Sequence, residues 1–178
     1  MNRKTRETYE SALSALKALV NNVNPETAMM DFEIAFHQAF AAVFPETFIS
    51  GCFFHLCENI RRNISEVGLK IAVRDNHQLA TSMAIFRALA FFPVEFVERA
   101  FVVLKNHLEE LYSERDDFAA IMAVCDYFEE TYVGKLVRRR RNQPLFAKEL
   151  WNMYEKTVEG DPRTNNSVEG GHNKLHSF

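Results

Sequence analysis

The chain has 178 residues, of which 47% are hydrophobic and 25% are charged, a balance that excludes a disordered or fibrous protein. The length suffices for one domain with a substantial core, and 16 phenylalanines predict that large aromatic side chains fill it. The net charge of −3 excludes a basic field over the whole surface, so any contact with nucleic acid must be local.

The opening segment predicts a helix and then a strand that ends in an acid. Apolar residues between Thr5 and Val20 recur every three or four positions, which indicates an amphipathic helix. The breaker cluster Asn21 to Pro25 separates this helix from the short apolar run Thr27 to Met30, which we interpret as a strand. Asp31 follows that strand directly.

A second unit of the same kind comes next. The stretch from Glu33 to Val43 predicts a helix, and the β-prone run Thr47 to Cys52 predicts another strand. Apolar residues from Leu56 to Val67, at steps of four and three, predict the helix after it. Two strand and helix units in succession favour an α/β layer arrangement.

Helical signals dominate beyond Leu69. We therefore expect an α/β protein that is predominantly helical. We expect one helix that ends before Pro93, others over Val94 to Leu111 and Phe118 to Tyr132, and a last one over Leu145 to Tyr154. On the second of these helices, the residues expected to face the core are Phe96, Ala100, Val103, Leu104, His107 and Leu108.

Neither a membrane nor an oxidising compartment is favoured. The three cysteines cannot all pair, and no secretory leader pattern is visible, so we expect a reducing, intracellular location. The longest apolar runs, such as Ala88 to Pro93, are too short to span a bilayer.

Asp31 and Glu169 are candidate metal-binding carboxylates. An acid at the carboxyl end of a strand lies where open α/β sheets bind ligands, but a helix N-cap is the commoner explanation of its position. Glu169 follows cap-forming residues, and a helix is expected to start near Asn166. Enzymes that cut DNA with two metal ions take carboxylates from distant segments, and this pair is compatible with that chemistry.

Cys52 and His55 have the Cys-x-x-His spacing of a candidate zinc pair. Four-coordinate zinc needs two more ligands, and Cys57, His172 and His176 form no recognised second half. A buried cysteine beside a capping histidine is the favoured alternative, so zinc is not expected.

Two basic segments are candidate DNA contacts, because each phosphate that a cation neutralises releases counterions. Arg61 and Arg62 lie on the helix after the second strand. The only run of charge is Arg138, Arg139, Arg140 and Arg141. The alternative for the run is a solvated helix end or loop.

In this order, the segments resemble the transposase domain of the Mutator-like (MULE) family. Met30 to Glu33 is similar to the family's strand with the second catalytic Asp, and Gly51 to Leu56 is similar to its Cys-x-x-His motif. Ala88 to Glu95 is similar to a motif of its helical insertion, in which an apolar helix ends at a proline. Asn166 to Asn173 is similar to the segment with its catalytic Glu.

This resemblance implies a partial ribonuclease H-like fold of the DDE superfamily. Residues 1–70 would be the C-terminal part of the core, 71–160 an all-helical insertion, and 161–178 the start of the helix with Glu169. The implied activity is metal-dependent cleavage of transposon-end DNA and strand transfer. Asp31 and Glu169 would hold Mg²⁺ or Mn²⁺, and His172 is a candidate accessory residue. The resemblance also implies that DNA is a partner, that the protein forms a homo-oligomer and that its location is nuclear.

Two departures from the family pattern bear on activity. Gly171 stands where the family has a tryptophan before the histidine. The first Asp of the triad belongs on a strand before the opening helix, and no acid before Asp31 follows a strand-like run. Because the metal ions supply much of the transition-state stabilisation, we expect this chain to be inactive by itself.

Incomplete strand pairing would also leave unpaired edges, so we expect the chain to be unstable or partner-dependent unless it is a fragment of a longer protein. A degenerate transposase-derived module that binds DNA or protein without catalysis is the alternative function. An unrelated helical interaction protein is a third hypothesis.

Overall fold

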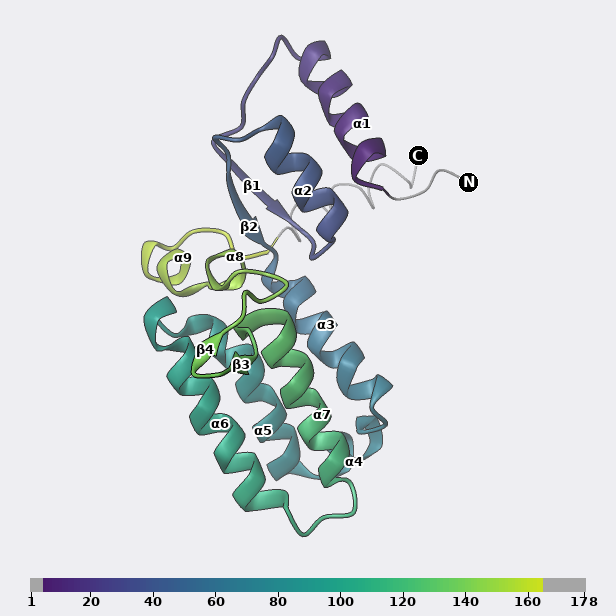
Figure 1. Cartoon of the computed structure of the whole chain (residues 1–178), viewed down its shortest axis with the longest axis vertical. Helices are drawn as coiled ribbons and strands as arrows, with labels where there is room; N and C mark the ends of the chain where they lie inside the picture. The colour runs from purple at the N-terminus through teal and green to yellow at the C-terminus, as the bar shows by residue number, and fades with distance from the viewer. Residues whose placement is uncertain (1–4, 165–178) are drawn as a thin grey trace. The chain divides into compact units, whose positions relative to one another are not determined.

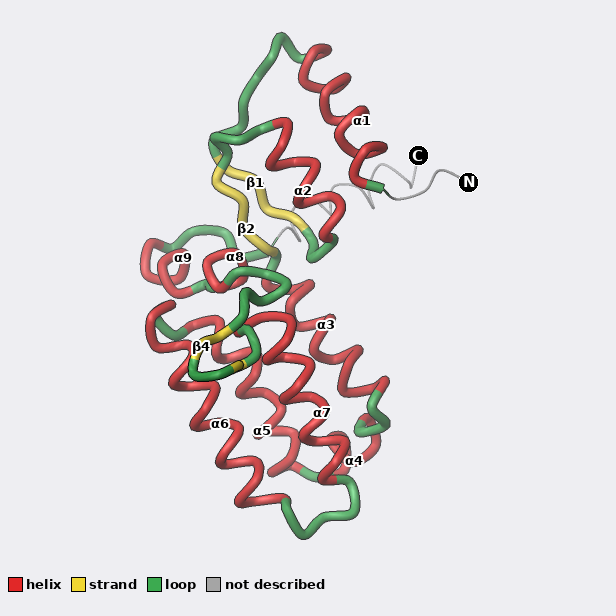
Figure 2. The backbone as a smooth tube through the Cα atoms, in the orientation of Figure 1, coloured by secondary structure: helices red, strands yellow, loops and turns green. Residues whose placement is uncertain are grey.

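The chain folds mostly into helices, with a few short strands (Figure 1, Figure 2). The computed structural model describes residues 5–164. The chain divides between Cys52 and Phe53 into two compact units, of which unit 2 is Phe53–Arg163 and unit 1 takes up the chain again at Thr164. The predicted helical character is confirmed. The boundary expected at residue 70 stays a prediction about the family's architecture.

The described part of unit 1 is built from two helices and two strands. Helix α1 (Arg6–Leu19) is followed by strand β1 (Thr27–Met30), helix α2 (Ile34–Val43) and strand β2 (Phe48–Gly51). The strands pair in parallel, and α2 is the crossover between them. These elements match the predicted ones to within two residues, because each has a clear apolar period and a breaker at its ends.

The core of unit 1 lies between α1 and α2 (Figure 1). Leu13, Ala39 and Phe44 are buried there, and the Tyr9 and Phe36 rings meet edge to face with their centroids 5.2 Å apart. This packing holds α2, and with it the turn that connects β1 to α2.

Unit 2 is helical except for one small hairpin. Its helices are α3 (Phe53–Glu66), α4 (Lys70–Asp75), α5 (His77–Ala88), α6 (Val97–Tyr112), α7 (Phe118–Phe128), α8 (Lys148–Trp151) and α9 (Tyr154–Glu159). Short 3₁₀ turns, η1 (Leu89–Phe91) and η2 (Val94–Phe96), join α5 to α6, and a π turn, η3 (Glu129–Val133), ends α7. The hairpin strands are β3 (Leu136–Val137) and β4 (Arg140–Arg141).

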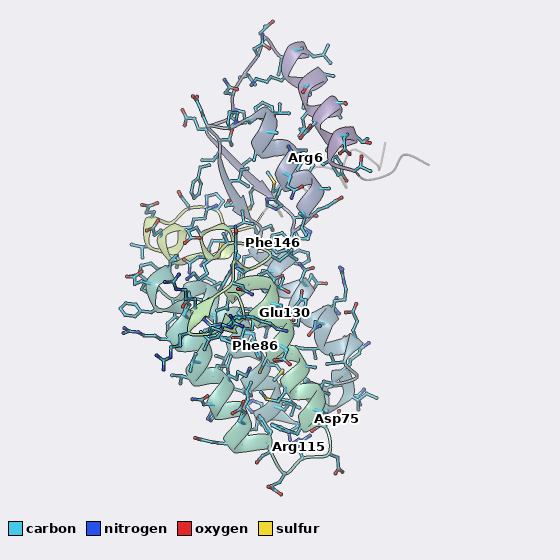
Figure 3. All side chains as sticks on the ribbon, in the orientation of Figure 1. Arg6, Asp75, Phe86, Arg115, Glu130 and Phe146 are labelled. Carbon is cyan, nitrogen blue, oxygen red and sulfur yellow. The ribbon has the colours of Figure 1, made fainter. Side chains whose placement is uncertain are left out.

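Aromatic side chains fill the core of unit 2, as the phenylalanine content predicts. Phe86, Phe101, Phe128, Tyr132 and Trp151 are fully buried, and Figure 3 labels Phe86 among the helices. The Phe128 ring lies 5.3 Å from that of Phe86 and 5.6 Å from that of Trp151, centroid to centroid. The indole N–H of Trp151 donates to the carbonyl oxygen of Tyr132 at 3.0 Å, so the one polar atom of that side chain is satisfied.

Two predictions for the helical region are wrong. The helix expected over 145–154 is interrupted at Asn152, where Asn152 Nδ2 donates to the carbonyl oxygen of Phe92 and the Met153 N–H donates to that of Ala90. These tertiary hydrogen bonds compete with those of a continuous helix. Helix α6 begins at Val97 rather than Val94, because η2 occupies the residues before it.

Candidate functional site at the carboxyl edge of the strands

Asp31 lies at the carboxyl end of β1, as predicted. Met30, the last residue of that strand, is paired in register with Gly51, the last residue of β2. Asp31 and Cys52 are therefore the first residues beyond two adjacent parallel strands, at the same edge. The Cys52 N–H donates to the carbonyl oxygen of Met30 at 3.0 Å and extends the ladder by one bond.

Asp31 is exposed, and it is not the N-cap residue of α2. Glu33 holds the N-cap position, two residues further on. Capping, the commoner explanation of an acid at this position, is thereby removed. Asp31 lies just beyond the carboxyl ends of two parallel strands. Open α/β folds bind ligands at such edges.

Two hydrogen bonds fix the turn that carries Asp31. The His37 ring, through Nε2, lies 2.6 Å from the carbonyl oxygen of Asp31 and donates to it. The Tyr9 hydroxyl donates to Glu33 Oε1 at 2.8 Å, and this bond raises the pKa of Tyr9. Side chains of α1 and α2 therefore restrain the turn, which favours a fixed direction for the Asp31 backbone.

His37 is a residue whose role the sequence did not reveal, because it lies among the apolar residues of α2. Burial lowers the pKa of His37, and this effect exceeds the opposing effects of the carbonyl and the charge of Asp31. A neutral imidazole that donates from Nε2 is consistent with that direction. The available signal was the spacing of six residues between Asp31 and His37, which spans the loop after β1 and the first turn of α2.

The Cys-x-x-His residues belong to different elements. Cys52 is fully buried at the end of β2, and His55 is half-buried in the first turn of α3. Within the described residues, Cys52, Cys57 and Cys125 form no disulfide. Within residues 5–164, no three histidines, cysteines or carboxylates gather as metal ligands would. Glu169 and His172 lie outside the described residues.

The arginine run forms a hairpin rather than a helix end. Arg138 and Arg139 are the two loop residues between β3 and β4, and Arg138, Arg139 and Arg140 are exposed. Both loop residues have positive φ, 47° and 70°, as in the two-residue turns that join twisted strands. Such turns ordinarily carry Asn or Gly, so the tip presents its arginines despite an unfavourable backbone conformation.

Arg141 differs from its three neighbours. Its guanidinium Nη1 lies 2.7 Å from Glu129 Oε1, its side chain is 12% exposed, and it covers the Phe101 ring at 5.9 Å from the centroid. Lys105 Nζ reaches the other oxygen of Glu129 at 3.4 Å. Arg141 is thus held inside unit 2 and stabilises the fold, which leaves three arginines at the surface for a ligand.

Arg61 and Arg62 are exposed on α3. Arg61 makes a bidentate pair with Glu58, at 3.0 Å from Nε to Oε1 and 2.5 Å from Nη2 to Oε2. That pair partly neutralises the weaker basic patch. Throughout the described helices, none combines the length and apolar character that a bilayer span requires.

A strand, helix and strand with an acid at the carboxyl edge define a segment of an α/β core. Comparison with known proteins adds a similarity: residues 1–59 match the family model of the MULE transposase domain. The resemblance inferred from Asp31 and the Cys-x-x-His motif is confirmed. Neither the curated proteins nor the solved structures gave a match.

Proposed function

We propose that this chain is part of a MULE-type transposase catalytic domain, with a ribonuclease H-like core and a helical insertion, whose parent cuts transposon-end DNA and transfers strands. The observation that carries the proposal is the position of Asp31. It follows a parallel strand, within the segment that matches the family, in register with the start of the Cys-x-x-His motif.

The ends of unit 2 support the idea of an insertion. The Phe53 N–H donates to the carbonyl oxygen of Arg163 at 3.0 Å, so the first and last residues of this unit are hydrogen-bonded to each other. Adjacent termini are what allow a domain to be inserted into another. The chain thus leaves unit 1 after β2 and returns to it at Thr164, five residues before Glu169.

The metal in this proposal is Mg²⁺ or Mn²⁺, with Asp31 and Glu169 as ligands. Carboxylates are the ligands that these cations prefer. The described residues do not supply a complete set of ligands, so we derive no catalytic step through the ion. Their contribution is structural: His37 and the Tyr9–Glu33 pair hold the turn from which Asp31 projects.

By itself the chain should not cleave DNA, because only two of the three carboxylates of the family triad have counterparts in its 178 residues. The test is incubation of the purified chain with linear and supercoiled DNA in Mg²⁺ or Mn²⁺. Cleavage by this chain would contradict the proposal of inactivity.

The site assignment is tested in the longer parent protein. Asp31→Asn and Glu169→Gln should each abolish Mn²⁺-dependent cleavage. Glu26→Gln is the matched control, because Glu26 is an exposed carboxylate just before β1, at the opposite end of the strand. Normal cleavage by both site variants would overturn the assignment.

A second candidate function is DNA binding without catalysis, and the hairpin tip favours it. Arg138 and Arg139 are the two turn residues, and Arg140 is the first residue of β4. Within the described residues, no carboxylate pairs with any of these three arginines. Cations in such a place contact phosphates without reading sequence. A nuclear location and self-association accompany either function as proposals.

Binding to duplex DNA should therefore weaken steeply as salt rises. Changing Arg138 and Arg139 to serine should lower the affinity and flatten the salt dependence. Arg141→Ser should alter stability more than DNA affinity, because its side chain is engaged with Glu129. Binding that is absent, or that is independent of salt, would remove this second function.

A further inference from the structure

One side of unit 2 contains a cleft that shares no lining residue with the strand edge at Asp31 or with the hairpin. It lies between α3, α4 and α5 and has a volume of about 280 Å³. The three helices contribute residues at steps of three and four, so the cleft runs along one continuous helical face of each. Helices α4 and α5 also pack on each other, and α3 packs on α5.

The floor of the cleft is apolar. Ile60 and Met83 line it and are only 1% and 2% exposed. Ile64, Val73 and Ala80 are half-buried around them. An apolar side chain placed here would leave water and pack against aliphatic groups, which is the favourable term in most association reactions.

The rim is cationic and contains no acid. Its charged residues are Arg61, Lys70, Arg74 and Arg87, all of them exposed. Glu58 and Asp75, which flank the cleft, pair with Arg61 and Arg74. Lys70 and Arg87 make no ion pair with any residue in the described range, so two positive charges, one on α4 and one on α5, remain available.

We propose that this cleft binds an acidic peptide segment of a partner protein, through one large apolar anchor in the floor and carboxylates on the rim. The cleft is slightly smaller than a typical small-molecule site, so it suits one anchor side chain better than a whole ligand. Helical segments with regularly spaced apolar residues bind grooves in this way.

Charge complementarity selects the occupant. A basic or neutral amphipathic helix would bring like charge, or none, to Lys70 and Arg87, and like charges oppose binding. A DNA backbone would satisfy the cations but would leave the apolar floor unfilled. The inference does not depend on the catalytic proposal, because no residue of the cleft belongs to unit 1.

The test is fluorescence anisotropy with the full chain and a fluorescein-labelled 15-residue peptide, with Leu and Phe at helical spacing and Glu elsewhere. Two control peptides replace every Glu by Lys, or every Leu and Phe by Ser. The acidic amphipathic peptide should bind, its affinity should fall as salt rises, and neither control peptide should bind measurably.

Arg87→Glu and Arg99→Glu form a matched pair of variants. Both arginines are exposed on helices of unit 2, and neither makes an ion pair with a described residue, but only Arg87 lines the cleft. Arg87→Glu should weaken peptide binding at least tenfold, and Arg99→Glu should change it less than twofold. Lys70→Glu repeats the test at the first residue of α4, where an acid suits the helix N-terminus and leaves folding intact.

Ala80→Phe tests the floor, since a larger side chain would occupy the cleft and should abolish binding. Circular dichroism verifies that each variant is folded. Equal binding by the Arg87 and Arg99 variants would overturn the proposal. So would loss of duplex DNA binding in the cleft variants with peptide binding unchanged, because that result would assign the cleft to DNA.

Discussion

The Nε2 atom of His37 lies 2.6 Å from the carbonyl oxygen of Asp31. This hydrogen bond joins Asp31, the first residue after β1, to the first turn of α2. The position of the Asp31 backbone therefore depends on the packing of that helix. Helix α2 packs against α1, and Leu13 of α1 and Phe36 of α2 belong to the same apolar cluster. The opening helix therefore contributes to the position of the Asp31 backbone.

His37 should titrate below its ordinary pKa of about 6.5. Burial disfavours the charged imidazole more than the carbonyl and carboxylate of Asp31 favour it. Because the folded pKa is lowered, the contribution of His37 to stability is complete above about pH 6.5 and is lost as the pH falls through the folded value. NMR titration of the six histidines, with His37→Gln to assign the resonance, measures the pKa. An unchanged pH dependence of unfolding in His37→Gln would contradict this account.

Glu129→Gln should destabilise the chain by about 3 kcal/mol, because it leaves Arg141 and Lys105 without their buried partner. Burial alone would raise the pKa of Glu129, but the hydrogen bond from Arg141 and the charge of Lys105 outweigh it and lower the pKa. The stabilisation is therefore present above about pH 4.5 and is lost as the pH falls below that value. Urea unfolding at pH 7 and pH 4 measures both effects.

The control for Glu129 is its neighbour. Glu130 pairs with Lys135 at the surface, and both side chains are about half exposed. Glu130→Gln removes the same charge, so it should change stability little. Equal losses in the two variants would show that the burial of Glu129 is unimportant.

The hairpin tip should become more stable when its arginines are replaced by residues that suit positive φ. Arg139→Gly, with or without Arg138→Asn, should raise the free energy of unfolding by about 1 kcal/mol. Arg140, which lies outside the loop in β4, offers the comparison: Arg140→Gly should lower stability. A gain in stability with a loss in DNA affinity would show that the tip is kept for binding.

Gly134→Ala should be more harmful than Gly68→Ala. Both glycines have positive φ, 93° and 85°, so alanine is strained at either position. A Cβ at Gly134 would also lie 2.0 Å from the carbonyl oxygen of Asn142, whereas nothing lies within 4 Å of one at Gly68. We expect a loss of about 1 kcal/mol at Gly68 and a clearly larger one at Gly134. Thermal unfolding of the two variants ranks them, and a reversed order would contradict the close approach.

The alternation of helix and strand around Asp31 could be predicted because its signals are local. A short apolar or β-prone run between breakers favours a strand, and β1 and β2 lie where those runs occur. The buried face of α6 was predicted less well. Phe96, Val103 and His107 were expected to face the core and are exposed. The buried stripe of α6 is instead Val97, Phe101, Leu104, Leu108 and Tyr112.

The sequence by itself determined the order of the described elements in unit 1, the acid at the end of β1 and the resemblance of residues 1–59 to the MULE transposase domain, since each depends on neighbours along the chain. Tertiary structure decided what adjacent residues of the same kind do. Arg140 faces solvent and Arg141 faces Glu129, although both are arginines of one run. The reason is that a side chain's partner is chosen by packing between distant segments, which the local pattern does not encode.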